Sequence, residues 1–271
     1  GLLDPQSGAM LRGAGDVIAW LLTTWTDLRV DAARMSAHRQ RLNVYQIDTW
    51  LNDPVDPLEW LNRELVTLLP IEPRQGPDGL WFALFPTEVG PTDAVARLDA
   101  NTREVQRESS IETDSSAIVN EVTVLYGPDR DSGDFRFRVT VGAQEGRIDD
   151  ELEGALADSR VRADYRAALS QQQFGRRTQT IQAKVIWDPA TATRIAQDVV
   201  ARQALPQRFV DYSGGPDLEV LEVGQVVTLT DTAVQLDDEL ALVLDVEVGG
   251  PEVLLSLQLL DDPVIAKPST P

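Results

Sequence analysis

The sequence contains no cysteine and only one histidine, His38. Without cysteine there are no disulfides, no thiolate nucleophiles and no cysteine-ligated metals. A Ser-His-Asp triad would have to use His38, and a zinc site would need carboxylates for nearly all its ligands, a set that suits zinc poorly. We therefore expect a protein that is not an enzyme, with no catalytic residues, no metal and no cofactor.

Long hydrophobic runs are also missing. The apolar runs are short, such as residues 17–22 and 240–246, whereas a membrane-spanning helix needs about 20 apolar residues. The chain shows no signal-peptide pattern, opens on Gly1 and closes on KPSTP. We expect no membrane span and interpret the chain as part of a longer polypeptide, with linkers at residues 1–12 and 263–271.

Positive charge is scarce, because 24 Lys and Arg face 44 Asp and Glu, for a net charge of −20. Residues 209–266 hold 13 acidic residues and no Lys, Arg or His. An acidic surface repels phosphate backbones, which disfavours sequence-independent binding to nucleic acid. Two interpretations remain: a solvated surface that resists aggregation, or a surface past which DNA slides without sticking.

The 271 residues, 42% of them hydrophobic, are enough for one large or two ordinary domains with real cores. Residues 13–26 predict a helix, and residues 57–69 predict a second one that Asp56 caps. A strand is predicted at residues 79–86. These elements predict a small α+β domain over residues 13–115.

Residues 117–127 and 135–141 predict a β-hairpin with a long tip, because the second segment alternates cleanly between apolar and polar residues. The tip carries Asp129, Asp131 and Asp134, which suggest calcium. Their spacing does not supply the alternate ligands and terminal glutamate of a calcium loop. We therefore interpret the tip as a solvated turn.

Residues 170–203 raise the question of whether they form a site or a joint in a scaffold. Residues 176–187 alternate like a strand, and Asp188 followed by Pro189 is typical of a helix start. The expected buried stripe of the helix is Ala192, Ile195, Ala196 and Val199. We predict a joint, in which a strand turns through a tight corner into a helix that covers its sheet.

The last third predicts successive strands, the final two joined by a glycine turn at residues 249–251. On the first of these two, the expected common face is Leu240, Leu242, Leu244, Val246 and Val248. On the second it is Val253, Leu255, Leu257 and Leu259. The pattern predicts an antiparallel β-barrel or sandwich-like domain over residues 116–262, so the predicted fold class is α+β and β-rich.

The order of four motifs resembles a known family. These are NEVTVLYG at residues 120–127, S-x-x-x-F-G-R at residues 170–176, an alanine-rich helix at residues 190–205, and LEVGQVVTLTD at residues 221–231. They resemble the hub (baseplate-hub or tail-tip) proteins of tailed bacteriophages and gene transfer agents. Gln225 departs from the family, which often has an acid there. The resemblance covers roughly the whole chain between its two linkers.

The resemblance implies a structural role. Such hubs form a ring, usually a homotrimer, that closes the distal end of the tail tube. The ring joins the tube and distal tail protein to a central spike or fibre, holds back the tape measure protein, and later lets the genome pass. On this basis we expect a virion protein of the tail tip, assembled in the host cytoplasm, past which DNA moves without specific binding.

Two sets of residues are candidates for this role. Asp237, Asp238 and Glu239 are candidates for an acidic patch that lines the lumen of the ring. Arg176 and Arg177 are candidates for contacts with acids of a neighbouring subunit, although a solvated strand start explains them equally well.

Two other functions stay open. One is a carboxylate-based glycoside hydrolase acting on cell walls, which would need two carboxyls about 5–10 Å apart in a cleft. Residues 149–158 hold five acidic residues. We interpret this segment as an exposed linker or helix face. A carbohydrate-binding β-module would present Trp50, Trp60 and Trp81 as a coplanar, exposed platform, although tryptophans on such elements more often belong to the core.

Overall fold

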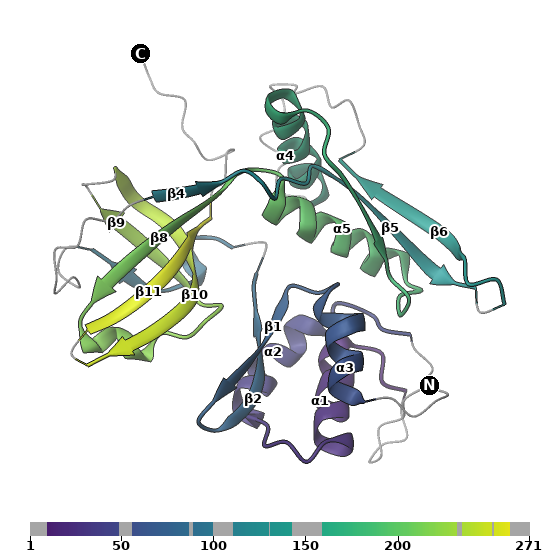
Figure 1. The fold of residues 1–271 in the computed structure, drawn as a ribbon, viewed down its shortest axis with the longest axis horizontal. Coiled ribbons are helices and arrows are strands. Elements are labelled where there is room, and N and C mark those ends of the chain that lie inside the picture. Colours follow the sequence, from purple (N-terminus) through teal and green to yellow (C-terminus); the bar gives the residue numbers. More distant parts are fainter. Residues whose placement is uncertain are drawn as a thin grey trace. The chain divides into compact units, whose positions relative to one another are not determined.

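The computed structural model describes residues 10–48, 56–86, 89–99, 111–129, 131–142, 159–231, 235–250 and 252–260. The chain folds into two compact units (Figure 1). The first unit comprises Gly1–Leu84 and Val119–Ala204, and the second comprises Phe85–Ile118 and Leu205–Pro271. None of the helices in the described ranges is long and apolar enough to cross a membrane.

These units do not follow the consecutive domains expected from the sequence, which met at residues 115 and 116. Each unit combines two separate stretches of chain. The reason is strand pairing between distant segments: strands from the middle of the chain join the sheet of the last third. Local patterns carry no information about such pairings.

The first stretch of the first unit is mainly helical. Its elements are α1 (Ala14–Trp25), α2 (Ala32–Leu42), α3 (Pro57–Leu61) with a π-helical turn (Asn62–Val66), and the antiparallel hairpin of β1 (Ile71–Gly76) and β2 (Gly79–Leu84). The side chain of Asp56 accepts hydrogen bonds from the N–H groups of Leu58 and Glu59, each at 2.9 Å. The predicted helices, cap and strand are present, but the second helix ends at Val66 instead of Leu69 and the strand at Leu84 instead of Pro86.

The second stretch builds a three-stranded sheet. Its elements are β5 (Glu121–Pro128), β6 (Phe135–Val141), α4 (Ser159–Phe174), β7 (Thr178–Gln182) and α5 (Pro189–Gln203). The sheet order is β6-β5-β7, with β6 antiparallel and β7 parallel to β5. Helix α5 packs on β5, β6 and α4, and its predicted stripe of alanine, isoleucine and valine is buried.

The joint between β7 and α5 exists, but the predicted strand is too long. Strand β7 ends at Gln182, and the next residues form a corner in which Ile186 donates to the carbonyl of Ala183 at 3.3 Å. The carbonyl of Ile186 in turn accepts from Gly127 of β5 at 2.8 Å. Ala183 and Val185 are buried in this corner, so their alternation reflects a buried turn rather than a strand. Asp188 caps α5 as predicted, accepting from Thr191 N–H at 2.7 Å.

The two stretches of the first unit meet at the segment that follows α2. The hydroxyl of Tyr45 donates to Oδ2 of buried Asp198 on α5 at 2.6 Å. The N–H of Gln46 donates to Oγ1 of Thr191 at 2.9 Å. Burial, together with the neighbouring Asp198 carboxylate, raises the pKa of the Tyr45 phenol far above its usual value.

The second unit is one six-stranded sheet. Its strands are β3 (Ala94–Leu98), β4 (Ile111–Asp114), β8 (Gln207–Gly214), β9 (Val226–Asp231), β10 (Leu236–Gly249) and β11 (Glu252–Leu259). The order is β3-β9-β10-β11-β8-β4, and every pair is antiparallel except β3 with β9. The predicted fold class, α+β and β-rich, is confirmed.

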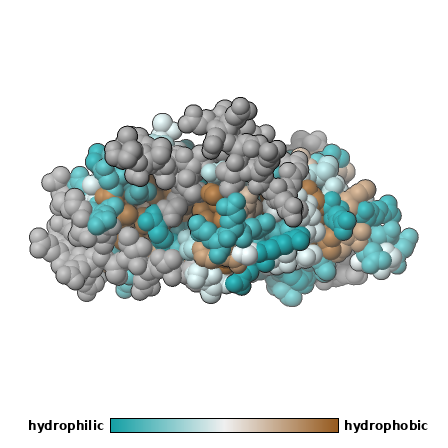
Figure 2. All heavy atoms as spheres, turned by 90° about the horizontal axis from the view of Figure 1, so that it is seen from above, coloured by the Kyte–Doolittle hydropathy of each residue, from teal (hydrophilic) through white to brown (hydrophobic). Residues whose placement is uncertain are grey.

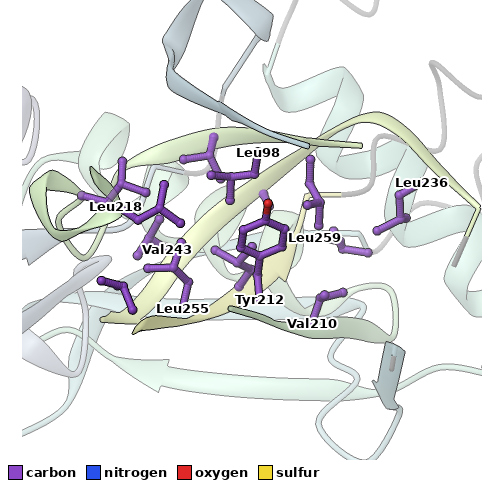
Figure 3. Packing of buried hydrophobic residues seen from close by; sticks show 14 residues of the cluster. Leu98, Val210, Tyr212, Leu218, Leu236, Val243, Leu255 and Leu259 are labelled. Carbon is purple, nitrogen blue, oxygen red and sulfur yellow. The ribbon is translucent and has the colours of Figure 1, made fainter. Parts of the chain in front are cut away.

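One face of this sheet carries the core of the second unit (Figure 3). Leu98 of β3, Tyr212 of β8 and Leu255 of β11 are each almost fully buried there. The Tyr212 ring lies among aliphatic side chains, and its hydroxyl donates to the carbonyl of Asp99 at 2.7 Å. A buried phenol keeps its hydrogen bond in this way, which makes it acceptable in an apolar core.

A β-bulge in β10 corrects one prediction. The register shifts between Val243 and Asp245, so Leu244 is the extra residue. Before the bulge Ala241 and Val243 belong to the core, and after it Val246 packs against the core. An extra residue reverses the alternation of side chains. The single apolar face predicted for β10 is therefore wrong, whereas the one predicted for β11 is confirmed.

The contact between Tyr45 and Asp198 predicts a pH-dependent effect of Tyr45→Phe. At pH 7 the free energy of unfolding of the variant should be lower than that of the wild type by about 1–3 kcal/mol, because the buried carboxylate loses a hydrogen-bond donor. Above about pH 10 tyrosine ionises in the unfolded chain while Tyr45 stays protonated in the fold. Above this pH the free energy of unfolding of the wild type should therefore fall by up to about 1.4 kcal/mol per pH unit more than that of the variant.

Urea unfolding followed by tryptophan fluorescence at pH 7 and pH 10–11.5 measures this difference. All six tryptophans lie in the stretches of the first unit, so the signal reports on that unit. Equal pH slopes for the two proteins would contradict the burial of the Tyr45 hydroxyl against Asp198.

Candidate functional site: the Asn120 junction and the charged candidates

The side chain of Asn120 is fully buried where β5 begins, and it forms three hydrogen bonds. Its Nδ2 donates to Oγ of Ser170 at 3.0 Å and to the carbonyl of Gly175 at 2.8 Å. Its Oδ1 accepts from the N–H of Arg177 at 2.7 Å. The amide thus binds the end of α4, the turn after it and the start of β7 to β5.

The backbone around Asn120 is bound as well. Nε2 of Gln171 donates to the carbonyls of Asn120, at 2.9 Å, and of Gly142, at 2.7 Å. Gly142 has φ +80°, and a Cβ there would overlap the carbonyl oxygen of Asn120. Its N–H donates to Oδ1 of Asp164 at 3.0 Å. Only glycine fits this position, which lies directly after β6.

Arg176 pairs with Glu121 of its own chain. Nε and Nη2 of the guanidinium donate to the two carboxylate oxygens, both at 2.6 Å. The side chain of Glu121 is 8% exposed and that of Arg176 is 64% exposed. The hydrogen bond and charge of Glu121 raise the pKa of Arg176. Such a two-point bond fixes orientation as well as distance.

These contacts explain the S-x-x-x-F-G-R motif. Ser170 and Gly175 hold Asn120, and Arg176 holds Glu121. Gly175 has φ +70° and its N–H donates to the carbonyl of Gln171 at 3.0 Å, as expected of a glycine that ends a helix. We name this set of contacts the Asn120 junction: Asn120, Glu121, Gly142, Ser170, Gln171, Gly175 and Arg176.

Arg177 lies next to the junction but takes part through its backbone. Its carbonyl accepts from the N–H groups of Asn120 and Glu121, at 3.0 and 3.1 Å, and its side chain is exposed. The intersubunit contact of Arg176 and Arg177 stays a prediction.

The acidic triplet lies at the start of β10, and its central residue, Asp238, forms contacts within the chain. Asp238 pairs with Arg97 at 2.9 Å and accepts from Oγ1 of Thr230 at 3.0 Å. Its φ of +53° is the left-handed conformation. Asp237 is exposed and Glu239 half-buried. The luminal role of Asp237, Asp238 and Glu239 stays a prediction.

The aspartates at the tip of the β5–β6 hairpin bind the tip itself. Oδ1 of Asp129 accepts from the N–H of Asp131 at 3.0 Å, and its other oxygen accepts from Arg136 at 3.0 Å. These two contacts, the N–H bond first, lower the pKa of Asp129. Within the described ranges no three His, Asp or Glu side chains group closely enough to hold a metal ion.

Trp60 and Trp81, the two described tryptophans of the proposed carbohydrate platform, do not form an exposed platform. Trp60 and Trp81 are 4% and 6% exposed. His38 stacks on Trp81 with ring centroids 5.9 Å apart, and Arg34 lies 5.4 Å from its centroid. Trp50 and the acidic run at residues 149–158 lie outside the described residues. On the surface seen in Figure 2, hydrophobic side chains form small groups bordered by hydrophilic ones.

The sequence predicts the strand that follows Asn120 but not the burial of Asn120 itself. It also missed the pair of Tyr45 and Asp198, which are 153 residues apart. A buried asparagine or aspartate gives no periodic signal. A polar residue directly before an apolar strand, together with the S-x-x-x-F-G-R motif, was the one available clue.

One family matches the sequence: residues 157–242 match the family described as "Putative phage tail protein". This segment runs from α4 into β10 and contains the S-x-x-x-F-G-R side of the Asn120 junction. It does not contain Asn120 or Glu121. No curated protein matches the sequence.

Solved structures resemble the fold at low sequence identity. The first is a chain of the "Virion of native gene transfer agent (GTA) particle", with a TM-score of 0.53 and 15% identity over 96% of this chain and 49% of that one. A second is a tail protein from Neisseria meningitidis MC58, with a TM-score of 0.43 and 16% identity over 79% of this chain and 57% of that one. A third is prophage tail protein gp18 from Listeria monocytogenes EGD-e, with a TM-score of 0.38 and 14% identity over 78% of this chain and 55% of that one. The chain spans about half the length of these structures.

The Asn120 junction predicts a large effect of Asn120→Ala. The change leaves the carbonyl of Gly175 and the N–H of Arg177 without their partner and opens a small void. We expect the free energy of unfolding to fall by about 2–4 kcal/mol. Urea unfolding followed by tryptophan fluorescence measures it, with Gln173→Ala on the exposed side of α4 as control. An effect of Asn120→Ala no larger than that of the control would refute the junction.

Proposed function

We propose that this chain is a segment of a phage-type tail hub. In this role it forms a ring, most simply a homotrimer, that closes the distal end of the tail tube. The ring connects the tube and the distal tail protein to a central spike or fibre. It retains the tape measure protein before infection and opens the path of the genome during it.

The observation that carries this proposal is the shared fold with a chain of the gene transfer agent virion, which extends over 96% of this chain. The match of residues 157–242 to a phage tail family supports it from the sequence. Together they support a structural part in a phage-type tail. The tail-tip position and the ring are the finer part of the proposal, and they follow from the resemblance of the ordered motifs to hub proteins.

The chemistry of the chain is compatible with this role. Buried polar groups of the first unit satisfy one another at the Asn120 junction and between Tyr45 and Asp198. Groups held in this way rigidify a scaffold. A component that transmits force between a tube and a spike needs such rigidity more than it needs a reactive site.

Labelling of intact particles tests the proposed position. An epitope can be inserted at Gly133 in the tip of the β5–β6 hairpin, where a Cβ would meet no atom within 4 Å. Antibody-coupled gold should then mark the distal tip of the tail in electron micrographs, and deletion of the gene should yield particles without a closed tail. Label on the head, or normal tails without the chain, would refute the proposal. Untagged particles are the control.

The luminal interpretation of the acidic triplet generates a separate prediction. Asp237→Lys combined with Glu239→Lys reverses two charges and spares Asp238, whose contact with Arg97 belongs to the fold. If the triplet lines the path of DNA, attraction of phosphates should slow ejection at least about threefold while particle yield stays normal. Time-resolved DNA release from purified particles measures it.

The matched control for this experiment is Asp217→Lys combined with Glu219→Lys in the turn Pro216–Val220. Both control side chains are exposed, and the net change in charge is identical. Unchanged ejection kinetics in the triplet variant, or equal slowing in the control, would show that the triplet does not line the path.

A further inference from the structure

Among the described residues, helices pack on one face of the three-stranded sheet of the first unit, and no described helix packs on the other face. Helices α4 and α5 pack together, and α5 packs on β5 and β6, whose Val122, Val124 and Val141 are buried. Side chains alternate along strands, so the neighbouring residues point to the other face. On β6 and β7 those residues are largely exposed: Arg136, Arg138, Thr178, Thr180 and Gln182.

This uncovered face presents hydrogen-bond donors. Arg138 has no ion-pair partner among the described residues and is exposed. Arg136 and Arg176 do pair with carboxylates, but their side chains are 54% and 64% exposed, against 27% for Asp129 and 8% for Glu121. The guanidinium groups therefore face solvent while their partners lie beneath them. We name these residues the basic face: Arg136, Arg138 and Arg176 with Thr123, Thr140, Thr178 and Thr180.

The sheet of the second unit has the opposite character on the face away from its core. The register places Asp245 of β10 beside Ser256 of β11, and Ser256 beside Asp211 of β8. Oγ of Ser256 donates to Oδ1 of Asp211 at 3.0 Å. Glu247 and Glu252 lie on the same face, on β10 and β11. We name these residues the acidic face: Asp211, Asp245, Glu247 and Glu252.

The bulge in β10 creates this face. If β10 alternated regularly through Leu244, Asp245 and Glu247 would fall on the side of the core. No Lys, Arg or His occurs between residues 209 and 266, the stretch that carries all four carboxylates. A row of like charges on neighbouring strands repels itself and is stabilised by an oppositely charged partner.

The two faces match in spacing. Arg136 and Arg138 are two residues apart on one strand, as are Asp245 and Glu247, so each pair is separated by about 6.8 Å. Two sheet faces with charges of opposite sign and equal repeat allow several ion pairs to form at once. We propose that the acidic face of one copy of this chain binds the basic face of a second copy.

This inference rests on the proposed hub function, and it says which surfaces hold neighbouring copies together. The contact joins two different surfaces, so each copy still offers its other face to a further copy. Repetition of such a contact closes a ring when the rotation fits. The exposed guanidinium of Arg176 then contributes to the contact without leaving Glu121, since it has donors to spare.

Nucleic acid fits the basic face less well. Three guanidinium groups are few compared with the roughly 6–10 phosphate contacts of proteins that hold DNA by charge. The chain as a whole carries a net charge of −20, which opposes the approach of a polyanion. A small acidic protein surface that matches the repeat of the strands is the better partner.

The contact should be weak and sensitive to salt. Three strands of this length give a face of roughly 300–400 Å², compared with about 800 Å² per partner in a standard interface. Sedimentation velocity of the chain at about 10–100 µM should show association at 50 mM NaCl. At 500 mM NaCl the association should weaken about tenfold, because salt screens exposed charges.

Charge reversal tests the surfaces one at a time. Arg138→Glu and Glu247→Arg each change an exposed side chain that has no ion-pair partner among the described residues, and each should weaken association about tenfold. Arg41→Glu, on the exposed side of α2, and Glu219→Arg are the matched controls and should leave association unchanged. Circular dichroism checks that all four variants are folded.

Mixing distinguishes a contact between copies from one within a chain. An equimolar mixture of Arg138→Glu and Glu247→Arg should associate, because each reversed face meets the other reversed face. The double variant should associate as well. If the double variant associates but the equimolar mixture does not, the two faces meet within one chain, and the proposal is overturned. No association at any salt concentration, or equal loss in the controls, would also overturn the proposal.

Two further readouts separate the remaining explanations. Loss of duplex DNA binding in Arg138→Glu, with association unaffected, would assign the basic face to nucleic acid and overturn the proposal. Gold labelling of particles that carry either single variant tests the hub function independently. Normal tail-tip labelling without any charge-dependent association would refute this contact and leave the proposed function intact.

Discussion

The buried side chain of Asn120 is the contact on which the first unit depends. One amide satisfies a hydroxyl, a carbonyl and an N–H from the end of α4, the following turn and the start of β7. Asn120 and Ser170 are fully buried, so the hydroxyl of Ser170 would cost free energy if the amide were absent. The parallel pairing of β5 and β7 needs a long connection through α4, and the junction closes that connection at the point where the two strands begin.

The same chain keeps its charges apart. In the first unit, arginine side chains pair with carboxylates that are less exposed than the arginines, as Arg176 does with Glu121. In the second unit carboxylates gather on one side of the sheet, with a serine between Asp211 and Asp245. A uniformly acidic monomer would only repel its copies. Segregation of charge onto two faces instead makes a directional contact between copies physically reasonable.

Much of the local structure could be predicted from the sequence. Helix starts at Asp56 and Asp188 are encoded by a capping side chain followed by proline, and both caps form. The alternation of β11 also survives in the fold. Prediction failed where a local pattern has two explanations: the alternating residues after Gln182 line a buried corner, and the apolar run of β10 contains a bulge at Leu244.

The sequence by itself determined the class of fold, the positions of most elements and the scarcity of reactive side chains, because propensity, capping and composition are local properties. Only the tertiary structure decided which strands share a sheet, that each unit joins two separate stretches, and that Asn120 is the centre of a junction. Those outcomes depend on contacts between residues far apart in the chain, such as Tyr45 with Asp198. Their energies come from burial and hydrogen bonding, which no single segment contains.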